Sequence, residues 1–188
     1  RADIKYVFSS SDGEIANEID AAAAESGIQL KFTVNGQKEG WLDYDALYPN
    51  FAPEFERPAD LKTTDPMLVF FSSGTTGYPK MVEHDYSYPL GHIMTARHWH
   101  KVNPNGLHLT VADTGWAKSM WGKLYGQWLC EAAVLTYDFD RFDAEKILPM
   151  FAKYNITTFC APPTMYRMLI KQDLSKYDLS SIHHATTA

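Results

Sequence analysis

The stretch FFSSGTTGYPK, Phe70 to Lys80, differs in composition from the rest of this 188-residue chain. It overlaps the end of the apolar run Met67–Phe71 and contains no acidic residue. A continuous apolar run is typical of a strand that is buried on both faces of a parallel sheet. We therefore expect the stretch to form a loop at the carboxyl edge of such a sheet, where open α/β sheets bind ligands.

Strand patterns and helix patterns alternate along the chain. Strands are expected at residues 4–10, 28–34, 66–71, 106–112, 133–137, 156–163 and 181–187, and helices at 13–27, 87–99, 115–132, 143–155 and 163–173. Gly27 is expected to cap the first helix, and residues 36–66 are typical of a proline-punctuated surface connection. Alternation of this kind predicts βαβ units, a largely parallel sheet with flanking helices, and the α/β layered class.

The overall composition excludes several classes of protein. Apolar residues make up 45% and aromatic residues 14% of the chain, which is too rich in core-forming side chains for a disordered segment. The net charge of −6 argues against a nucleic-acid-binding surface. The sequence contains no apolar run of about 18 residues, so no membrane span is expected. Cys130 and Cys160 lie in apolar contexts and are predicted to be buried free thiols in a reducing compartment.

The stretch after Phe71 is rich in groups that bind anions. Glycines without a Cβ allow tight turns and let backbone N–H groups approach an anion closely. Its glycines, hydroxyl donors and positive charge are Gly74, Gly77, Ser72, Ser73, Thr75, Thr76 and Lys80. The spacing does not fit a Walker A loop, and the chain has no G-x-G-x-x-G motif. On composition alone, a flexible linker fits this stretch as well as a phosphate-binding loop does.

The segment SSGTTGYPK resembles the phosphate-binding signature of the adenylate-forming superfamily, which includes acyl-CoA synthetases, luciferases and the adenylation domains of peptide synthetases. The resemblance continues in order through KMVEH, DTGW, APPTMYRMLIKQDL and HHATTA. This combination looks most like the medium-chain and acetyl-type acyl-CoA synthetases. It is strong over residues 65–188 and weaker over the first 60 residues.

The resemblance implies a two-step ligase. A carboxylic acid would react with ATP, with the help of Mg²⁺, to give acyl-AMP and pyrophosphate, and coenzyme A would then displace AMP. It implies that Ser72–Gly77 and Lys80 hold the β- and γ-phosphates. It also implies that Trp116, Thr187 and Ala188 line the acyl pocket, although core packing fits Trp116 about as well and is the favoured role of Pro162, Pro163 and Met165. No catalytic residue is expected within this chain.

The seven histidines do not predict a metal site. His98 and His100 fall at an expected helix end, where residues two apart do not converge. His183 and His184 are adjacent and would point to opposite faces of a strand.

Both ends of the chain look like interior sequence, so we expect a piece of the large N-terminal domain of a longer enzyme. Residues 1–64 would be a partial βαβ segment with a surface connection, and residues 65–188 the part that carries the phosphate loop. Such a piece is expected to be inactive by itself, because the family's Tyr-Gly-x-Thr-Glu motif and its late lysine lie outside it.

The resemblance leaves two alternatives open for the whole protein. In the first, the whole protein adenylates an aryl or amino acid. In the second, it is a non-catalytic nucleotide-binding relative. The expected partners are a small carboxylic acid, ATP and coenzyme A, without nucleic acid or a membrane span. The expected location is the cytoplasm, or the mitochondrial matrix in a eukaryote.

Overall fold

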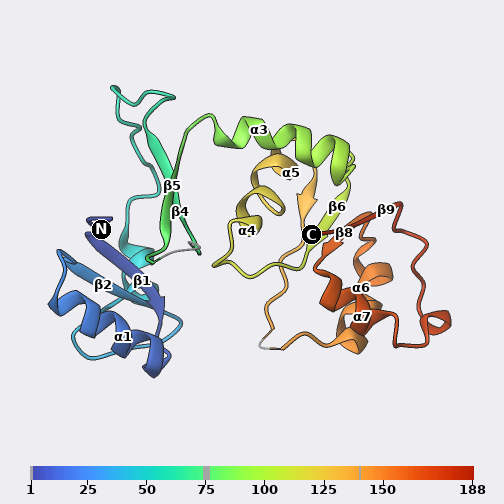
Figure 1. The fold of residues 1–188 in the computed structure, drawn as a ribbon, viewed down its shortest axis with the longest axis horizontal. Coiled ribbons are helices and arrows are strands. Elements are labelled where there is room, and N and C mark those ends of the chain that lie inside the picture. The colour runs from blue at the N-terminus through green and yellow to red at the C-terminus, as the bar shows by residue number, and fades with distance from the viewer. Residues whose placement is uncertain (1, 74–76, 140) are drawn as a thin grey trace. The chain divides into compact units, whose positions relative to one another are not determined.

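The structure, a computed structural model, describes residues 2–73, 77–139 and 141–188. The chain divides into two compact units, Arg1–Leu61 and Lys62–Ala188 (Figure 1). Helices and parallel strands alternate in both units, so the predicted α/β class is confirmed.

The first unit contains a small parallel sheet. Its strands pair in the order β1-β2-β3, and α1 connects β1 to β2. Phe8 of β1 stacks on Phe32 of β2 with ring centroids 4.5 Å apart. The elements of this unit are β1 (Tyr6–Ser10), α1 (Gly13–Ala24), β2 (Leu30–Val34), β3 (Leu42–Asp43), α2 (Tyr44–Leu47) and the 3₁₀ turn η1 (Tyr48–Asn50).

Two details of the first unit differ from the sequence predictions. Helix α1 ends at Ala24 and is capped by Glu25, so Gly27 is not its cap. Residues 36–66 are not all loop, because they contain β3, α2 and η1. The Asp43 side chain accepts a hydrogen bond from the Ala46 backbone N–H at 3.0 Å. That bond satisfies a donor that the start of a helix leaves free, which explains why a short helix forms within the polar connection.

The second unit contains a hairpin, a parallel sheet and the helices that pack on this sheet. The four strands of the sheet pair in the order β7-β6-β8-β9, and every pairing is parallel. The elements are β4 (Pro66–Ser72), β5 (Lys80–Asp85), α3 (Tyr88–Met94), the π-helical segment η2 (Thr95–Trp99), β6 (Leu107–Thr110), α4 (Lys118–Trp121), α5 (Tyr125–Leu129), β7 (Ala133–Val134), α6 (Ala144–Tyr154), β8 (Thr158–Ala161), α7 (Pro163–Leu169), the 3₁₀ turn η3 (Leu174–Lys176) and β9 (His184–Thr187).

The environment predicted for the apolar run Met67–Phe71 is wrong. Strand β4 pairs antiparallel with β5, and its residues are at most half-buried. The connection 73–79 is far shorter than the dozen or so residues that a parallel crossover requires. The residues after Lys80 also form a strand, which the sequence prediction did not include. Phe70–Ser72 therefore end one strand of a hairpin, and Lys80 begins the other.

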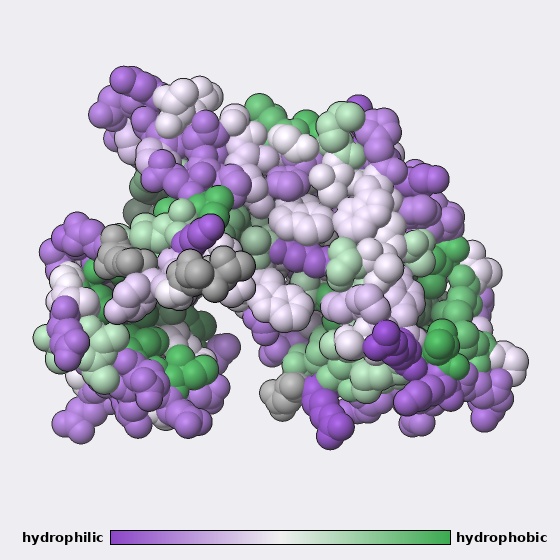
Figure 2. Space-filling model, in the orientation of Figure 1, coloured by the Kyte–Doolittle hydropathy of each residue, from purple (hydrophilic) through white to green (hydrophobic). Residues whose placement is uncertain are grey.

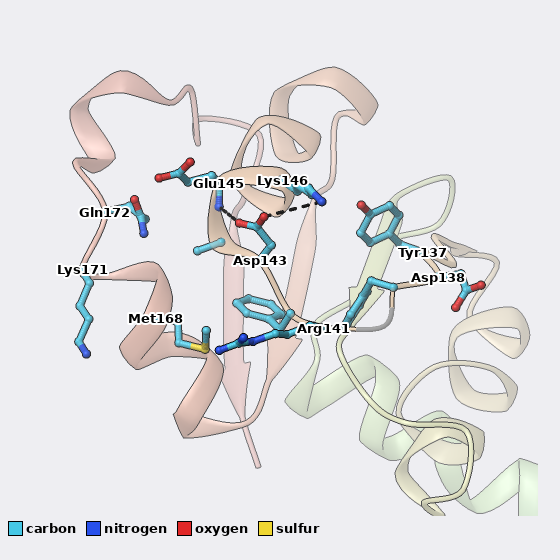
Figure 3. Close-up of a pocket in the computed structure, with 12 residues that line it drawn as sticks. Tyr137, Asp138, Arg141, Asp143, Glu145, Lys146, Met168, Lys171 and Gln172 are labelled. Atoms are coloured by element: carbon cyan, nitrogen blue, oxygen red, sulfur yellow. Dashed lines mark hydrogen bonds and ion pairs between the residues drawn. The ribbon is translucent and has the colours of Figure 1, made fainter. Parts of the chain in front are cut away.

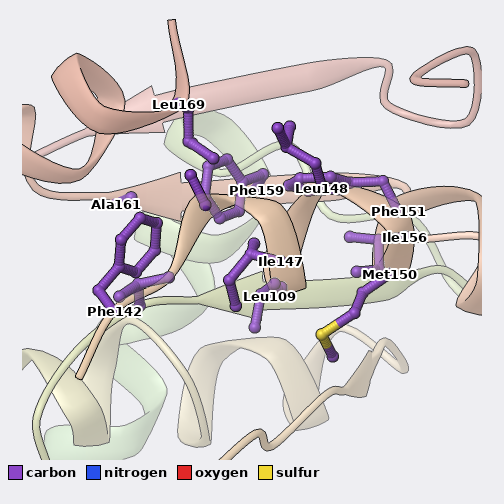
Figure 4. Packing of buried hydrophobic residues seen from close by; sticks show 12 residues of the cluster. Leu109, Phe142, Ile147, Leu148, Met150, Phe151, Ile156, Phe159, Ala161 and Leu169 are labelled. Carbon is purple, nitrogen blue, oxygen red and sulfur yellow. The ribbon is translucent and has the colours of Figure 1, made fainter. Parts of the chain in front are cut away.

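The core of the second unit lies between the four-stranded sheet and helices α6 and α7. Helix α6 turns Ile147, Leu148 and Phe151 toward Leu109 of β6 and Phe159 of β8 (Figure 4). These five side chains are 1 to 3% exposed. The spacing of Ile147, Leu148 and Phe151 along α6 places these three side chains on one helical face. A single stripe of apolar residues therefore fixes this helix on the sheet.

The helix predicted over residues 115–132 is broken in the structure. Helix α4 ends at Trp121, and α5 begins at Tyr125. The Gly122 carbonyl oxygen accepts hydrogen bonds from the Thr110 hydroxyl and, at 3.0 Å, from Gln127 Nε2. An uninterrupted α-helix would use this oxygen for the N–H group four residues later. Side chains have taken the place of that bond.

Apolar side chains reach the surface over α3, where Leu90 and Met94 are exposed (Figure 2). This helix is short, and no residue within Tyr88–Met94 is fully buried. Within the described parts of the chain, no helix is both long enough and apolar enough to cross a membrane.

Candidate functional site

Two of the predicted phosphate-binding residues lie at the adjoining ends of β4 and β5. Ser72 is the last residue of β4, and Lys80 is the first residue of β5. Their Cα atoms are register partners, so both side chains project from the same face of the hairpin. Gly77 has a φ of 83°, a conformation that other residues rarely adopt. The side chains of Ser73 and Lys80 are exposed, so they are accessible to a ligand.

Three of the predicted phosphate-binding residues, Gly74, Thr75 and Thr76, lie outside the described residues. The structure therefore places Ser72, Ser73, Gly77 and Lys80 of the predicted set.

A run of ring contacts connects the hairpin to the helices of the second unit. The ring centroid of Phe70 in β4 lies 6.0 Å from that of Tyr88, and the Tyr88 centroid lies 4.5 Å from that of His92. His92 stacks on Trp121 at 5.9 Å, and Trp121 lies 6.2 Å from His100. Burial raises the pKa of Tyr88 and lowers that of His92, so both rings are uncharged at neutral pH. The strand beside the loop is thus attached to the interior of the unit.

The second group of predicted residues lies at the carboxyl edge of the four-stranded sheet. Trp116 belongs to the segment after β6, and Pro162 follows β8. Thr187 is the last residue of β9, and Ala188 follows it. Trp116 is 59% exposed, so its ring is not part of the core. It lines a cavity of about 740 Å³ together with Pro162 and Met165. This edge is where ligands bind in open parallel sheets.

A second cavity, of about 780 Å³, lies between the start of α6 and the end of α7 (Figure 3). The Asp143 carboxylate at the start of α6 accepts the backbone N–H of Glu145 at 3.0 Å and lies 3.9 Å from the Lys146 ammonium. The Arg141 side chain extends toward Met168 of α7 (Figure 3). Both residues also line the cavity that contains Trp116, so the two cavities share a wall.

The structure connects the Trp116 segment to the end of β9 through Lys118. The Lys118 ammonium donates a hydrogen bond to the Ala188 carbonyl oxygen at 3.1 Å. Lys118 is only 8% exposed although it carries a charge. Two segments that the sequence predicted separately, near Trp116 and at Ala188, therefore meet at one buried side chain.

Behind Lys118, a cluster of buried polar side chains surrounds the Gly122 carbonyl oxygen. The Thr110 hydroxyl uses its hydrogen for this carbonyl and lies 2.7 Å from His108 Nε2. It must then accept from Nε2–H, which leaves Nδ1 to accept from the Thr158 hydroxyl at 2.8 Å. The geometry fits a neutral His108 with its proton on Nε2. Burial, together with the nearby charge of Lys118, lowers the pKa of His108 to about 4.

A second buried histidine lies against the first. The His100 and His108 ring centroids are 4.8 Å apart, and His100 Nδ1 lies 3.3 Å from the Thr186 hydroxyl of β9. Burial lowers the pKa of His100 to about 3, and His108 and Lys118 add to this effect. His100 Nε2 and Gln127 Oε1 are buried without a hydrogen-bond partner in the described structure. Such orphaned atoms are uncommon in folded proteins.

Sequence reasoning missed Lys118, His100 and His108 as parts of this region. The signal that was present is a lysine within an apolar helical segment, Trp116–Trp121. A charged residue on an otherwise apolar segment points either to solvent or to a polar site, and only the fold decides between them. As for metals, no group of three His, Cys, Asp or Glu side chains that could hold an ion is found among residues 2–73, 77–139 and 141–188.

Comparison with known proteins identifies the family to which this chain belongs. A family model described as AMP-binding enzyme matches residues 1–188. The chain belongs to this family, which confirms the resemblance stated from the loop and the motifs that follow it.

Curated relatives include acyl-CoA synthetases. The human mitochondrial acyl-coenzyme A synthetase ACSM4 is 35% identical over 195 residues, which cover 98% of this chain and 33% of that protein. The human mitochondrial acyl-coenzyme A synthetase ACSM3 is 36% identical over 177 residues, which cover 93% of this chain and 30% of that protein. The chain thus spans about a third of the length of these relatives.

Solved structures share the fold. The anthranilate CoA ligase AuaEII, in complex with anthranoyl-AMP, aligns with a TM-score of 0.79 at 23% identity, over 97% of this chain and 35% of that chain. ATP-bound MatB from Rhodopseudomonas palustris aligns with a TM-score of 0.78 at 16% identity, over 99% of this chain and 35% of that chain.

Proposed function

We propose that the whole protein is an ATP-dependent acid–CoA ligase that forms AMP. It would activate a carboxylic acid as acyl-AMP and transfer the acyl group to coenzyme A. The observation that carries this proposal is the family match over residues 1–188, supported by the exposed hairpin tip that presents Ser72, Ser73 and Lys80.

In this proposal the hairpin tip, Ser72–Gly77 with Lys80, binds the β- and γ-phosphates of ATP. Charge develops on the phosphoryl oxygens and on the departing pyrophosphate, and donors held in place before the reaction stabilise this charge. Ser72 and Lys80 project from the same face of the hairpin, so a hydroxyl and an ammonium can act on one phosphate group. Gly77 lets the tip change its backbone conformation as pyrophosphate leaves.

The acyl group would lie at the carboxyl edge of the four-stranded sheet. Trp116 supplies an exposed aromatic face, and the cavity it lines is large enough for a small organic acid. Thr187 and Ala188 do not line this cavity and would contact the acyl group from the end of β9. Ala188 is already linked to the Trp116 segment by the Lys118 hydrogen bond.

Magnesium and coenzyme A belong to the proposal for the whole protein. Mg²⁺ binds carboxylate and phosphate oxygens and keeps several waters. The proposed location is the cytoplasm or, in a eukaryote, the mitochondrial matrix. The relatives ACSM3 and ACSM4 are named as mitochondrial.

The proposal is tested by exchange of labelled pyrophosphate into ATP, catalysed by the full-length protein in the presence of a carboxylic acid. Exchange that depends on the acid, followed by formation of an acyl-CoA, supports it. A protein that catalyses no exchange with any acid from acetate to decanoate contradicts it. Exchange without transfer to coenzyme A favours an adenylating enzyme that uses a different acceptor.

A further inference from the structure

Two cavities of the second unit meet along helix α7. The first, of about 740 Å³, is lined by Trp116 and Met165, and the second, of about 780 Å³, by Lys171 and Gln172. Met168 lines both cavities. On the α7 side, the boundary between the two cavities therefore falls at the Met168 side chain.

The order of the lining residues gives the first cavity a direction. Pro162 lines it at the carboxyl edge of the sheet, directly before α7 begins. Met165 and Met168 follow at intervals of three residues, which places them on one side of the helix. At 1.5 Å per residue, Met168 lies about 9 Å further along the helix axis than Pro162. A molecule that extends from the sheet edge along α7 thus passes Met165 before it reaches Met168.

The chemical character of the lining changes at Met168. Before this position α7 contributes the apolar side chain of Met165. Beyond it the second cavity is lined by charged and polar side chains, namely Glu145, Lys146, Lys171 and Gln172. An apolar tail that entered among these groups would displace the water that solvates them, which costs free energy. The space that suits an apolar chain therefore ends at Met168.

Arg141 forms the other side of the same boundary. It lines both cavities, and its side chain extends toward Met168 (Figure 3). Met168 is 38% exposed and does not belong to the buried core of the unit. Replacing it should therefore alter the cavity much more than the stability of the fold.

We propose that Met168 is a specificity-determining residue that limits the length of the acid. The substrates are straight-chain monocarboxylic acids whose apolar tails lie along α7, and the longest acid accepted is the one whose end reaches Met168. This inference rests on the proposed function, because it takes the cavity that contains Trp116 as the acyl pocket.

The physical reason for a sharp limit is the tail's environment at the boundary. Each methylene that fits in an apolar pocket adds about 1–3 kcal/mol to discrimination between acids. A methylene beyond Met168 has to push aside the Met168 and Arg141 side chains and then meets charged groups. The gain per carbon should therefore stop, and reverse, at one particular chain length.

The test measures kcat/KM for straight-chain acids from two to sixteen carbons, by pyrophosphate exchange with the full-length protein. The length limit is the length beyond which kcat/KM falls by about tenfold or more. Met168→Ala removes the side-chain atoms beyond Cβ and should move the limit up by about two to three carbons. Acids just above the original limit should gain at least about tenfold in kcat/KM, while the shortest acids stay unchanged.

Two further variants test the same residue and provide a control. Met168→Phe places a larger and more rigid side chain at the boundary and should move the limit down. Met94→Ala removes a methionine on α3 that is 62% exposed and lines neither cavity. It should leave the limit unchanged. Thermal unfolding shows whether each variant is folded.

A measurement on the unmodified protein decides if neither Met168 variant folds. An acid of the limiting length that carries a photoreactive diazirine at the end of its tail should label Met168 or Arg141. Labelling confined to other residues overturns the inference.

Other outcomes are equally decisive. A length limit that stays the same in folded Met168→Ala and Met168→Phe refutes the inference and leaves the proposed function intact. An equal fall in kcat/KM for short and long acids in both variants also refutes it, because Met168 would then only support the fold. Absence of exchange with every acid in the unmodified protein refutes the proposed function and the inference with it.

Discussion

Ser72 and Lys80 are register partners across the last pair of the β4–β5 hairpin. This pairing fixes the distance between the two Cα atoms and places both side chains on one face of the hairpin. A hydroxyl and an ammonium are therefore held side by side where the two strands end.

The Lys80 ammonium is expected to be important for adenylation. Lys80→Ala in the full-length protein should lower the rate of pyrophosphate exchange by about ten- to a thousand-fold, as is typical for losing one donor from a site of developing charge. Lys176→Ala removes another exposed lysine, the last residue of η3, which pairs with Asp173, and should leave exchange unchanged. Unaltered turnover of the Lys80 variant would show that the hairpin tip does not bind the phosphates.

Trp116 is expected to influence which acid is used. Because its side chain is 59% exposed, Trp116→Ala should change the free energy of unfolding by no more than about 0.5 kcal/mol. The same variant should shift the ratio of kcat/KM values among acids of different size, since it enlarges the cavity. Thermal unfolding and exchange assays measure the two effects separately. A large loss of stability with unchanged acid preference would assign Trp116 to core packing.

Gly126 allows α5 to lie close to α3. A Cβ at Gly126 would be 2.9 Å from Ala96 Cβ and would overlap the His92 carbonyl oxygen. Gly126→Ala should therefore lower the free energy of unfolding by about 1–3 kcal/mol, the usual cost of overpacking. Gly91→Ala in α3 is the control, because nothing lies within 4 Å of its added Cβ. It should raise stability by up to about 1 kcal/mol through helix propensity. Denaturant unfolding distinguishes the two.

The buried histidines predict how stability depends on pH. The pKa values of His100 and His108 in the folded state, about 3 and about 4, lie below the ordinary value of 6.5. The unfolded chain therefore binds protons more readily as the pH falls below 6.5. Their contribution to stability is complete above that pH and declines down to about pH 3–4, by up to about 1.4 kcal/mol per pH unit for each histidine.

This pH effect can be separated from that of the carboxylates. Hydrogen bonds from Ser87 and Ser180 lower the pKa values of Asp85 and Asp178 below 3.8 in the folded state, so their contributions are lost only at still lower pH. His108→Gln should make the stability curve less steep between pH 6.5 and 4. An unchanged slope in denaturant titrations over this range would contradict the assignment of a buried neutral imidazole.

The sequence predicted the order of elements in the second unit well where its patterns were strong. Helix α6 has an apolar stripe, a capping residue at Asp143, and Asn155 in a left-handed conformation at its end. Pro163 correctly marked the start of α7. In these places local preferences and burial favour the same structure, so pattern and fold agree.

The hairpin and the break at Gly122 were not predictable in the same way. An apolar run such as Met67–Phe71 has the same pattern in a parallel and an antiparallel strand, and its partner decides between them. The break depends on Thr110 and Gln127, which reach the Gly122 carbonyl oxygen from β6 and α5. Periodicity over residues 115–132 contains no information about Thr110.

The burial of Lys118 depends on the same kind of long-range information. Nothing near Trp116 in the sequence indicates that the end of β9 will lie within hydrogen-bonding distance. The residues of the proposed phosphate loop could be named from composition and resemblance because they are contiguous. The buried polar residues behind Lys118 come from separate segments, and only the folded chain brings them together.

The Gly122 carbonyl oxygen has one further consequence. Thr110, Gln127 and His108 all direct a polar atom at it, and it is a main-chain atom. Point mutation can delete any one of these donors, but it cannot delete the acceptor that they share. Substitutions at these three positions can therefore change how many side chains donate to this oxygen, but they do not remove the oxygen itself.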